Sequence, residues 1–314
     1  MTYNSGNTIV ATDYMSFRGA NAPIVSYTSD ASATNKVAAL IGVGYGQRGY
    51  GVTSTVLPSV IANTSIVTAT VWNNLRSAMS VINIHTGSGL TLQPVISSSN
   101  LIVANDGRPT LTNVPALIST LDNNRFNVGA GQSTTSNVLT STKTVSWTNS
   151  VFHEFIMGFA VEDQARYFFN TGGKIRLTAS RIDGTPGGVN DALTSMLSAM
   201  GNVFFGAVNS TYSGTGGTVS SIGYYGLTST YQTVFIANGT GAFPNISYSL
   251  LARRENYTGL NGGNGSLIRY RAFFDISNYI AEIADGTLTS SVSSVRSTGA
   301  INISNPTYST TLNL

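Results

Sequence analysis

The sequence predicts an α+β fold that is mainly β, with a small helix-containing N-terminal region followed by an antiparallel β-sandwich of jelly-roll-like type. Three observations predict it. Apolar residues recur at helical spacing in the first part of the chain. From about residue 140 they alternate with polar residues in short runs separated by glycine-rich turns. Finally, 33 of the 314 residues are glycine and only 9% are charged, against roughly 25% in an average soluble protein.

These patterns divide the chain into three parts. We expect residues 1–22 to form an extended N-terminal arm, residues 23–132 a helix-containing docking region, and residues 140–314 the β-sandwich. The low-complexity stretch Ser133–Asn137, which is rich in Ser, Thr and Asn, is the best candidate for a linker.

Helical spacing is clearest in Thr68–His85, where Val71, Leu75, Ala78, Met79 and Ile82 share one face. Thr68 or Thr70 is expected to cap its start, and Gly87 to end it. Four further helices are expected, at Ala31–Ile41 with Gly42 as its stop, at Val114–Leu121 with Asn113 as cap and Pro115 in the first turn, and at about 162–169 and 190–200.

Period-two alternation predicts four strands, at Lys174–Ser180, Thr230–Ile236, Ser247–Arg253 and Leu267–Phe274. In the last of these, Ile268, Tyr270, Ala272 and Phe274 fall on one face and both arginines on the other. The tail, Ser290–Leu314, is expected to be a final edge strand or a docking segment.

The run Gly42–Gly51, which contains Tyr45 and Tyr50, has a GxGxG spacing that invites a nucleotide-binding interpretation. A dinucleotide fingerprint needs a strand before it, a helix after it and an acidic residue about 20 residues on. Here a predicted helix precedes, extended chain follows, and no Asp or Glu occurs between Asp30 and Asp106. A P-loop lysine is missing too. We therefore expect a packing loop whose backbone contacts protein.

Catalytic and metal-binding patterns are weak throughout. Glu154 and Asp163 are the acidic pair considered for polysaccharide cleavage, but no spacing places them across a sugar. His153 and Glu154 are adjacent, so on a strand they face opposite sides and cannot cooperate. His85 and His153 are the only histidines, too few for a zinc site. Weak calcium binding by Asn105–Gly107 and by the 261–265 loop stays open beside simple turn formation. We expect no enzyme, no cofactor and no catalytic or metal residue.

Composition also bounds the partners. The 16 basic and 13 acidic residues form no cationic stripe, so nucleic acid is not expected. Apolar runs fall far short of the roughly 20 residues of a membrane-spanning helix, and no signal peptide is visible, so we expect a soluble protein made in the cytoplasm. There are no cysteines, which excludes disulfides and thiolate metal sites.

Tyrosines beside Gly, Ser and Asn loops are the candidates for recognition, since this composition binds sugars and proteins at modest entropic cost. The alternative is that tyrosine is simply a good strand residue with a polar tip. The candidates are Tyr45, Tyr50, Tyr212, Tyr224, Tyr225 and Tyr257.

Four stretches that together span most of the chain carry a resemblance: 37–51, 68–87, 147–176 and 221–274. The second includes Trp72 and Arg76. The most specific part runs from Arg166 to Arg176 and includes Phe168, Phe169, Gly172 and Gly173. These stretches resemble virion structural proteins of T4-like marine myophages, the cyanophages and their relatives. From the residues themselves, we expect Phe168 and Phe169 to cap one end of the sandwich, and Gly172-Gly173 to permit a tight reversal that leads Ile175 and Leu177 into the core.

The resemblance implies a place in a virus particle rather than a chemical mechanism. We expect a non-enzymatic structural component of a tailed phage virion, associated with the tail, baseplate or fibre and assembled in the host cytoplasm. Its expected partners are other virion proteins and further copies of itself, with a trimer favoured, and a host-surface glycan is an additional partner class. The alternatives are a capsid decoration or neck protein, and a carbohydrate-binding receptor module.

Overall fold

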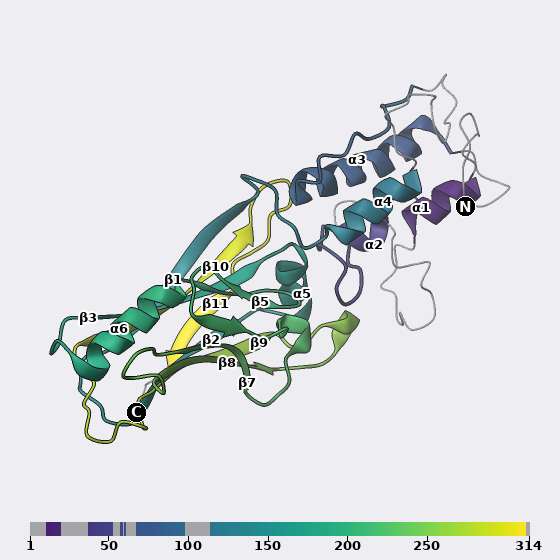
Figure 1. Cartoon of the computed structure of the whole chain (residues 1–314). Coiled ribbons are helices and arrows are strands. Elements are labelled where there is room, and N and C mark those ends of the chain that lie inside the picture. Colours follow the sequence, from purple (N-terminus) through teal and green to yellow (C-terminus); the bar gives the residue numbers. More distant parts are fainter. Residues whose placement is uncertain are drawn as a thin grey trace. The chain divides into compact units, whose positions relative to one another are not determined.

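The computed structural model describes residues 11–19, 37–52, 57–58, 60, 67–97 and 114–311. The chain divides into two compact units (Figure 1). The first comprises residues 1–134, 166–172 and 297–303, and the second comprises residues 135–165, 173–296 and 304–314. Two short segments from the C-terminal half thus belong to the first unit, which the sequence did not indicate.

The described N-terminal part of the first unit contains the helices α1 (Ala11–Arg18), α2 (Val37–Ile41), α3 (Ala69–Thr86) and α4 (Val114–Asn123). The predicted extended arm is therefore wrong over Ala11–Arg18. Tertiary contacts explain the helix, because Tyr14 and Phe17 are buried and the Arg18 Nε donates to the Leu57 carbonyl at 2.8 Å. Residues 1–10, 20–22 and 31–36 and Asn113 lie outside the described residues.

Helix α3 has the expected ends. The Thr68 Oγ1 accepts a hydrogen bond from the Val71 N–H at 3.3 Å, and Gly87 adopts the left-handed conformation, with φ of 65°, after the last turn. Leu75, Ala78, Met79 and Ile82 are buried as predicted, and Trp72 joins them. The hydrophobic pattern of this helix was thus sufficient to predict its buried face.

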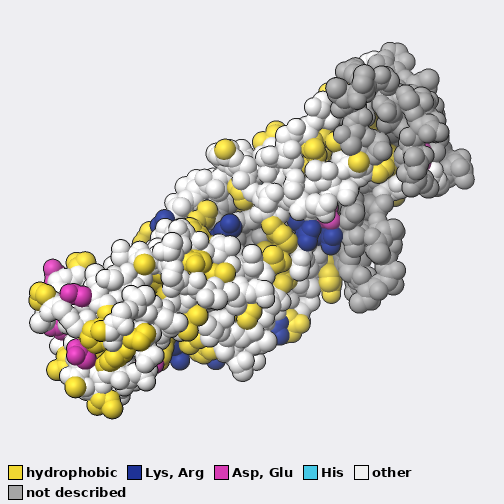
Figure 2. Space-filling model, in the orientation of Figure 1, with side chains coloured by type: hydrophobic (Ala, Val, Ile, Leu, Met, Phe, Trp, Pro, Cys, Tyr) yellow, Lys and Arg dark blue, Asp and Glu magenta, His cyan; other side chains and the backbone are white. Residues whose placement is uncertain are grey.

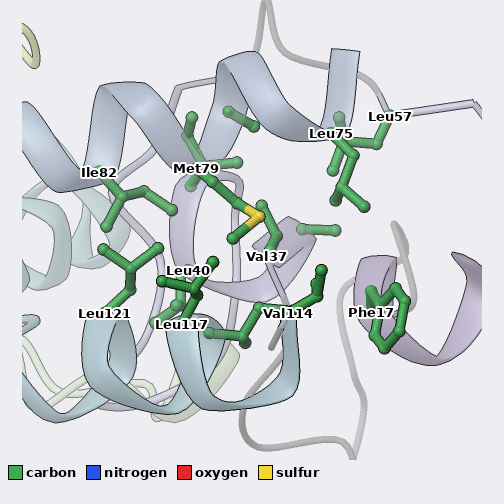
Figure 3. Close-up of a cluster of buried hydrophobic side chains, with 14 of the residues drawn as sticks. Phe17, Val37, Leu40, Leu57, Leu75, Met79, Ile82, Val114, Leu117 and Leu121 are labelled. Carbon is green, nitrogen blue, oxygen red and sulfur yellow. The ribbon is translucent and has the colours of Figure 1, made fainter. Parts of the chain in front are cut away.

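The core of the first unit lies between α3 and α4, with α2 beside them (Figure 3). Ile82 and Met79 of α3 point toward Leu117 and Leu121 of α4, and Leu40 of α2 lies in the same cluster. These aliphatic side chains are almost completely removed from water, and this burial drives the association of the helices.

The second unit is an antiparallel β-sandwich, which confirms the predicted fold class. One sheet has five strands in the order β1-β10-β3-β4-β5, and the other has six in the order β11-β2-β9-β8-β7-β6. The strands of the first sheet are β1 (Ser133–Lys143), β3 (Lys174–Ile182), β4 (Val203–Phe205), β5 (Ser210–Tyr212) and β10 (Thr287–Ser297). Those of the second are β2 (Ser150–Gly158), β6 (Gly217–Val219), β7 (Gln232–Asn238), β8 (Ser247–Glu255), β9 (Leu267–Asp275) and β11 (Thr307–Thr311).

Aromatic and polar side chains join the inner faces of the two sheets. Phe205 of β4 meets Tyr270 of β9 edge to face, with ring centroids 5.4 Å apart. His153 of β2 is hydrogen-bonded through Nδ1 to the Ser290 Oγ of β10 at 2.8 Å. The sandwich also includes α6 (Gly188–Met200), which packs against β3 and β7 and so contacts both sheets.

Two predictions near the sandwich need correction. Ser133–Asn137 is the beginning of β1 rather than a linker, although the division between the units falls inside it. Ser, Thr and Asn indicate a loop by composition, but Thr also fits a pleated sheet. In the tail, β10 lies between β1 and β3, and only β11 is an edge strand.

Helix α5 (Glu162–Asn170) ends in the residues that fasten the glycine–tyrosine loop. Arg166 is fully buried, and its guanidinium donates to three loop carbonyls, those of Val43 at 2.8 Å, Arg48 at 2.9 Å and Gly46 at 3.2 Å. The Asn170 Nδ2 donates to the carbonyls of Gly46 and Gly49 at 3.0 and 3.1 Å. The loop backbone therefore contacts protein, as the sequence indicated.

The loop can approach Arg166 this closely because of its glycines. Gly49 has φ of 106°, and a Cβ there would lie 2.1 Å from the Val43 carbonyl oxygen. On its other side the loop is held by Arg48, whose Nε and Nη2 each donate to Asp122 of α4 at 2.8 Å. The loop therefore serves packing, with its carbonyls collected around one buried cation.

The end of α5 contains residues that the sequence singled out. Phe168 and Phe169 are fully buried with their rings 5.1 Å apart, and they belong to the first unit. Gly172, with φ of 74°, makes the predicted reversal with Gly173 after it, and Ile175 and Leu177 then enter the core of the sandwich.

Replacing Arg166 by Ala should lower the unfolding free energy of the first unit by about 3 kcal/mol or more, because several buried carbonyls lose their donor. Arg166→Lys should recover only part of this loss, since a single ammonium group cannot reach the three carbonyls as the planar guanidinium group does. Trp72 is in the first unit and Trp147 in the second, so denaturant unfolding followed by fluorescence in a Trp147→Phe background reports on the first unit.

The matched control is Arg176→Ala, which removes a partly exposed guanidinium whose Nε donates to Ser293 in the second unit. It should leave the Trp72 transition unchanged. Equal transitions for the Arg166 and Arg176 variants would contradict the assigned role of Arg166.

Candidate functional site

The predicted recognition tyrosines are divided between the units, with Tyr45 and Tyr50 in the first and the other four in the second. Tyr257 is 54% exposed, with the Arg254 guanidinium 3.6 Å from its ring centroid. Tyr45, Tyr212 and Tyr225 are half-buried. Tyr212 donates its hydroxyl to the Gly217 carbonyl at 2.8 Å. Among the six candidates, Tyr257 is thus the one most open to a partner.

Two of the candidates are buried, so the prediction that they contact a partner at the surface is wrong. Tyr50 is buried, its hydroxyl donates to the Arg125 carbonyl at 2.8 Å, and burial raises its pKa strongly. Tyr224 is fully buried and donates to the Gly265 carbonyl at 2.9 Å. In both cases a distant carbonyl satisfies the polar tip, which allows a tyrosine in a glycine-rich stretch to become a core residue.

The densest group of functional side chains lies on the outer face of the six-stranded sheet, and we call it the arginine face. It comprises Phe152, Glu154, Tyr231, Arg253, Glu255, Arg269 and Arg271. The strand register explains it, because Glu154 of β2 lies opposite Arg271 of β9, and Arg253 of β8 lies opposite Arg269. Alternation along each strand then places these residues on one surface.

Glu154 is the centre of this face. Its carboxylate accepts from Arg271 Nη2 at 2.9 Å, Arg269 Nη1 at 3.2 Å and Thr311 Oγ1 at 3.0 Å, and also from the Tyr231 hydroxyl. Burial works to raise the pKa of Glu154, but these hydrogen bonds outweigh it and lower the pKa to about 2. The carboxylate is ionised at every ordinary pH, which does not suit a general acid.

Arg271 is held between two aromatic rings. Its guanidinium carbon lies 4.2 Å from the Phe152 centroid and 4.4 Å from the Tyr231 centroid. Burial and the hydrogen bond to Glu154 raise the pKa of Tyr231 to about 12, so its hydroxyl stays protonated as a donor. Three arginines against two glutamates leave this face with one net positive charge, and each arginine side chain keeps a partly exposed surface.

His153, the neighbour of Glu154, points the opposite way, as the strand alternation predicted. It is fully buried between the sheets, where its ring meets Phe274 at 5.8 Å. Burial, and to a smaller degree the charge of Lys143, lowers the pKa of His153 to about 4. A neutral histidine on the inner face and an ionised glutamate on the outer face cannot act as one catalytic pair.

The second acidic candidate, Asp163, accepts a hydrogen bond from the loop 256–265, as does its neighbour Glu162. Asp163 accepts from the Asn261 Nδ2 at 2.8 Å, while its neighbour Glu162 accepts the backbone N–H groups of Thr258, Leu260 and Gly265 at 3.2, 3.2 and 2.7 Å. Protein carboxylates and amides therefore organise this loop, which was one of the two weak calcium candidates. The other, Asn105–Gly107, lies outside the described residues.

Within the described part of the chain, no group of three or more His, Asp and Glu side chains is arranged to hold a metal ion. Trp72 and Arg76 line a hollow of about 10 Å³ in the first unit, which is room for about one water molecule. No helix among the described residues combines the length and apolarity needed to cross a bilayer.

The sequence contained part of the signal for the arginine face. Alternation in Leu267–Phe274 placed Arg269 and Arg271 on one surface, as found. The contributions of Phe152, Tyr231 and Arg253 were missed, because they depend on which strands become neighbours in the sheet.

The stability of the sandwich should depend on the ionisation of Glu154. A folded pKa of about 2, against 4.5 for the free residue, stabilises the fold fully above about pH 4.5, and this contribution is lost as the pH falls toward 2. The loss amounts to at most about 3 kcal/mol. Unfolding of a Trp72→Phe variant, followed through Trp147, measures it.

In the same background, Glu154→Gln should be less stable at pH 7 and should show a flatter profile between pH 4.5 and 2. Glu255→Gln, which changes a more exposed carboxylate of the same face, is the control and should keep the slope. Parallel profiles for Glu154→Gln and the parent protein would contradict the assignment.

Comparison with known proteins identifies no family for this chain. No protein-family model, no curated protein and no solved structure matches the chain.

Proposed function

We propose that the chain is a non-enzymatic structural component of a tailed bacteriophage virion, associated with the tail, baseplate or fibre. The proposal rests first on the resemblance of four stretches of the sequence to virion proteins of T4-like marine myophages. It is supported by what the most specific of these stretches does in the fold.

The observation that carries the proposal is the use of Arg166–Gly172. Arg166 and Asn170 bind loop carbonyls, Phe168 and Phe169 are buried, and Gly172 makes a reversal. The stretch that most resembles the virion proteins therefore has a structural role, because its residues fasten a loop, fill the core and reverse the chain. This fits a protein whose task is to hold a shape.

The candidate chemistry supports a non-enzymatic role. Glu154 is ionised and surrounded by donors, and Asp163 is engaged by Asn261. A polysaccharide-cleaving pair needs one carboxyl group that is protonated near neutral pH. Neither the geometry nor the pKa of Glu154 favours that role.

The composition supports assembly into a larger structure. Few of the side chains on the face in Figure 2 are charged, and only 9% of all residues are. Surfaces of this kind lose little solvation free energy when they meet other proteins. We propose other virion proteins and further copies of the chain as partners, with assembly in the host cytoplasm.

Mass spectrometry of purified phage particles, separated into heads and tails, tests the proposed place. The chain should be found with the tail fraction at several copies per particle. Recovery with the heads would favour a capsid decoration or neck protein instead. A stable monomer that is absent from purified particles would contradict the proposal.

A second candidate function is glycan recognition, favoured by the arginine face. Arg271 between two aromatic rings presents a cation beside apolar ring surfaces, a combination suited to sugars that carry carboxylate or sulfate groups. Tyr257 with Arg254 offers a similar pair. The two buried tyrosines are no longer candidates for this contact.

Binding to an array of neutral and acidic glycans tests this second function. Arg271→Ala should weaken binding to acidic glycans about tenfold or more, because it removes a charged hydrogen-bond donor. Arg176→Ala, on the outer face of the other sheet, is the matched control and should bind like the parent protein. An array without any signal above background would contradict glycan recognition.

A further inference from the structure

Among the described strands, four lie at the edges of the sandwich, and three of these are short. Strands β5 and β6 have 3 residues each and β11 has 5, whereas β1 has 11. An edge strand presents unpaired N–H and C=O groups that can template another strand, and shortness is one of the ways in which proteins prevent this. The edge of β1 does not have this protection.

Up to Lys143, strand β1 also lacks the charged residues and prolines that protect other edge strands. Ser133–Thr142 contains no charged residue and no proline, and Lys143 comes only at its end. Charged residues and prolines are what natural edge strands use to reject a second strand. Instead, Val138 is 65% exposed, and Thr140 and Thr142 are exposed on the same face.

We propose that β1 is an assembly edge that pairs antiparallel with β1 of a second copy of this chain. Two five-stranded sheets then join into one sheet of ten strands. Antiparallel pairing of two 11-residue strands joins them by backbone hydrogen bonds.

Strand length and charge identify the partner as a second copy. Among the edge strands of the two described sheets, another β1 is the one long enough to cover β1 along its length. Antiparallel pairing of a strand with itself brings like residues together around a two-fold axis, and the uncharged residues of Ser133–Thr142 meet without repulsion.

This inference deepens the proposed function and rests on the part of it that concerns assembly. It gives the assembly a two-fold axis, whereas the sequence analysis favoured a trimer. Uncharged hydroxyl groups also connect β1 to its neighbour β10, since Thr140 Oγ1 lies 3.1 Å from Ser291 Oγ on the outer face.

Disulfide cross-linking tests the pairing directly, because the chain contains no cysteine. Val138→Cys, Thr140→Cys and Thr142→Cys are made one at a time in the full chain and oxidised under mild conditions. At least one of them should give a covalent dimer, since a residue near a two-fold axis meets its own copy. Ser180→Cys, an exposed position on β3 inside the same sheet, is the control and should stay monomeric on denaturing gels.

Charge repulsion provides a second, independent readout. The pair Val138→Lys and Thr140→Lys should raise the dimer dissociation constant at least about tenfold in sedimentation experiments, because like charges then face each other across the axis. The pair Thr178→Lys and Ser180→Lys adds the same charge to the central strand β3 and should leave the constant unchanged.

A parent chain that sediments as a monomer would overturn the inference, as would an oligomer that both lysine pairs leave intact. Cross-linking at Ser180 equal to that at the β1 positions would overturn it too. These results are distinguishable from failure of the proposed function, which is measured by the presence of the chain in purified particles rather than by its self-association.

Discussion

The fold of the first unit depends on one buried guanidinium. Arg166 donates to three carbonyls of the glycine–tyrosine loop, and Asn170 one turn later adds two more hydrogen bonds. A cation removed from water is tolerated because carbonyl dipoles replace its hydration. The loop then presents Arg48 to Asp122 of α4, and Tyr50 to His85 at a ring distance of 5.2 Å, so helices far apart in the sequence are joined around it. Glycine is required where the backbone passes closest, at Gly44 and Gly49.

This use of the loop is the reverse of a phosphate site. A phosphate cradle gathers backbone N–H groups around an anion, whereas this loop gathers carbonyl groups around a cation. The sequence supported rejection of nucleotide binding, because the flanking strand, the lysine and the acidic residue were missing. It could not identify the cation, since Arg166 lies more than a hundred residues away and only the tertiary fold brings it to the loop.

The other helices and strands were predicted where their signals are local in the sequence, and missed where they depend on residues far apart in the sequence. Helix α3 was predicted with both caps because Thr68, Gly87 and the apolar stripe are local signals. Strands β3, β8 and β9 were predicted because alternation is local as well. Strand β1 was mistaken for a linker at its start, and β4, β5 and β6 were missed because three residues carry too little pattern. The buried tyrosines and the arginine face depend on strand order, which one sequence does not specify.

Native-state hydrogen exchange measures whether the glycine–tyrosine loop is a fastened packing element. The amides of Tyr50, Gly51 and Val52 donate to carbonyls at 2.9 to 3.0 Å. In the parent protein they should exchange as slowly as the amides in the middle of α3, and in Arg166→Lys they should exchange at least about tenfold faster. Fast exchange of these amides in the parent protein, or equal rates in the two proteins, would show that Arg166 does not fasten the loop.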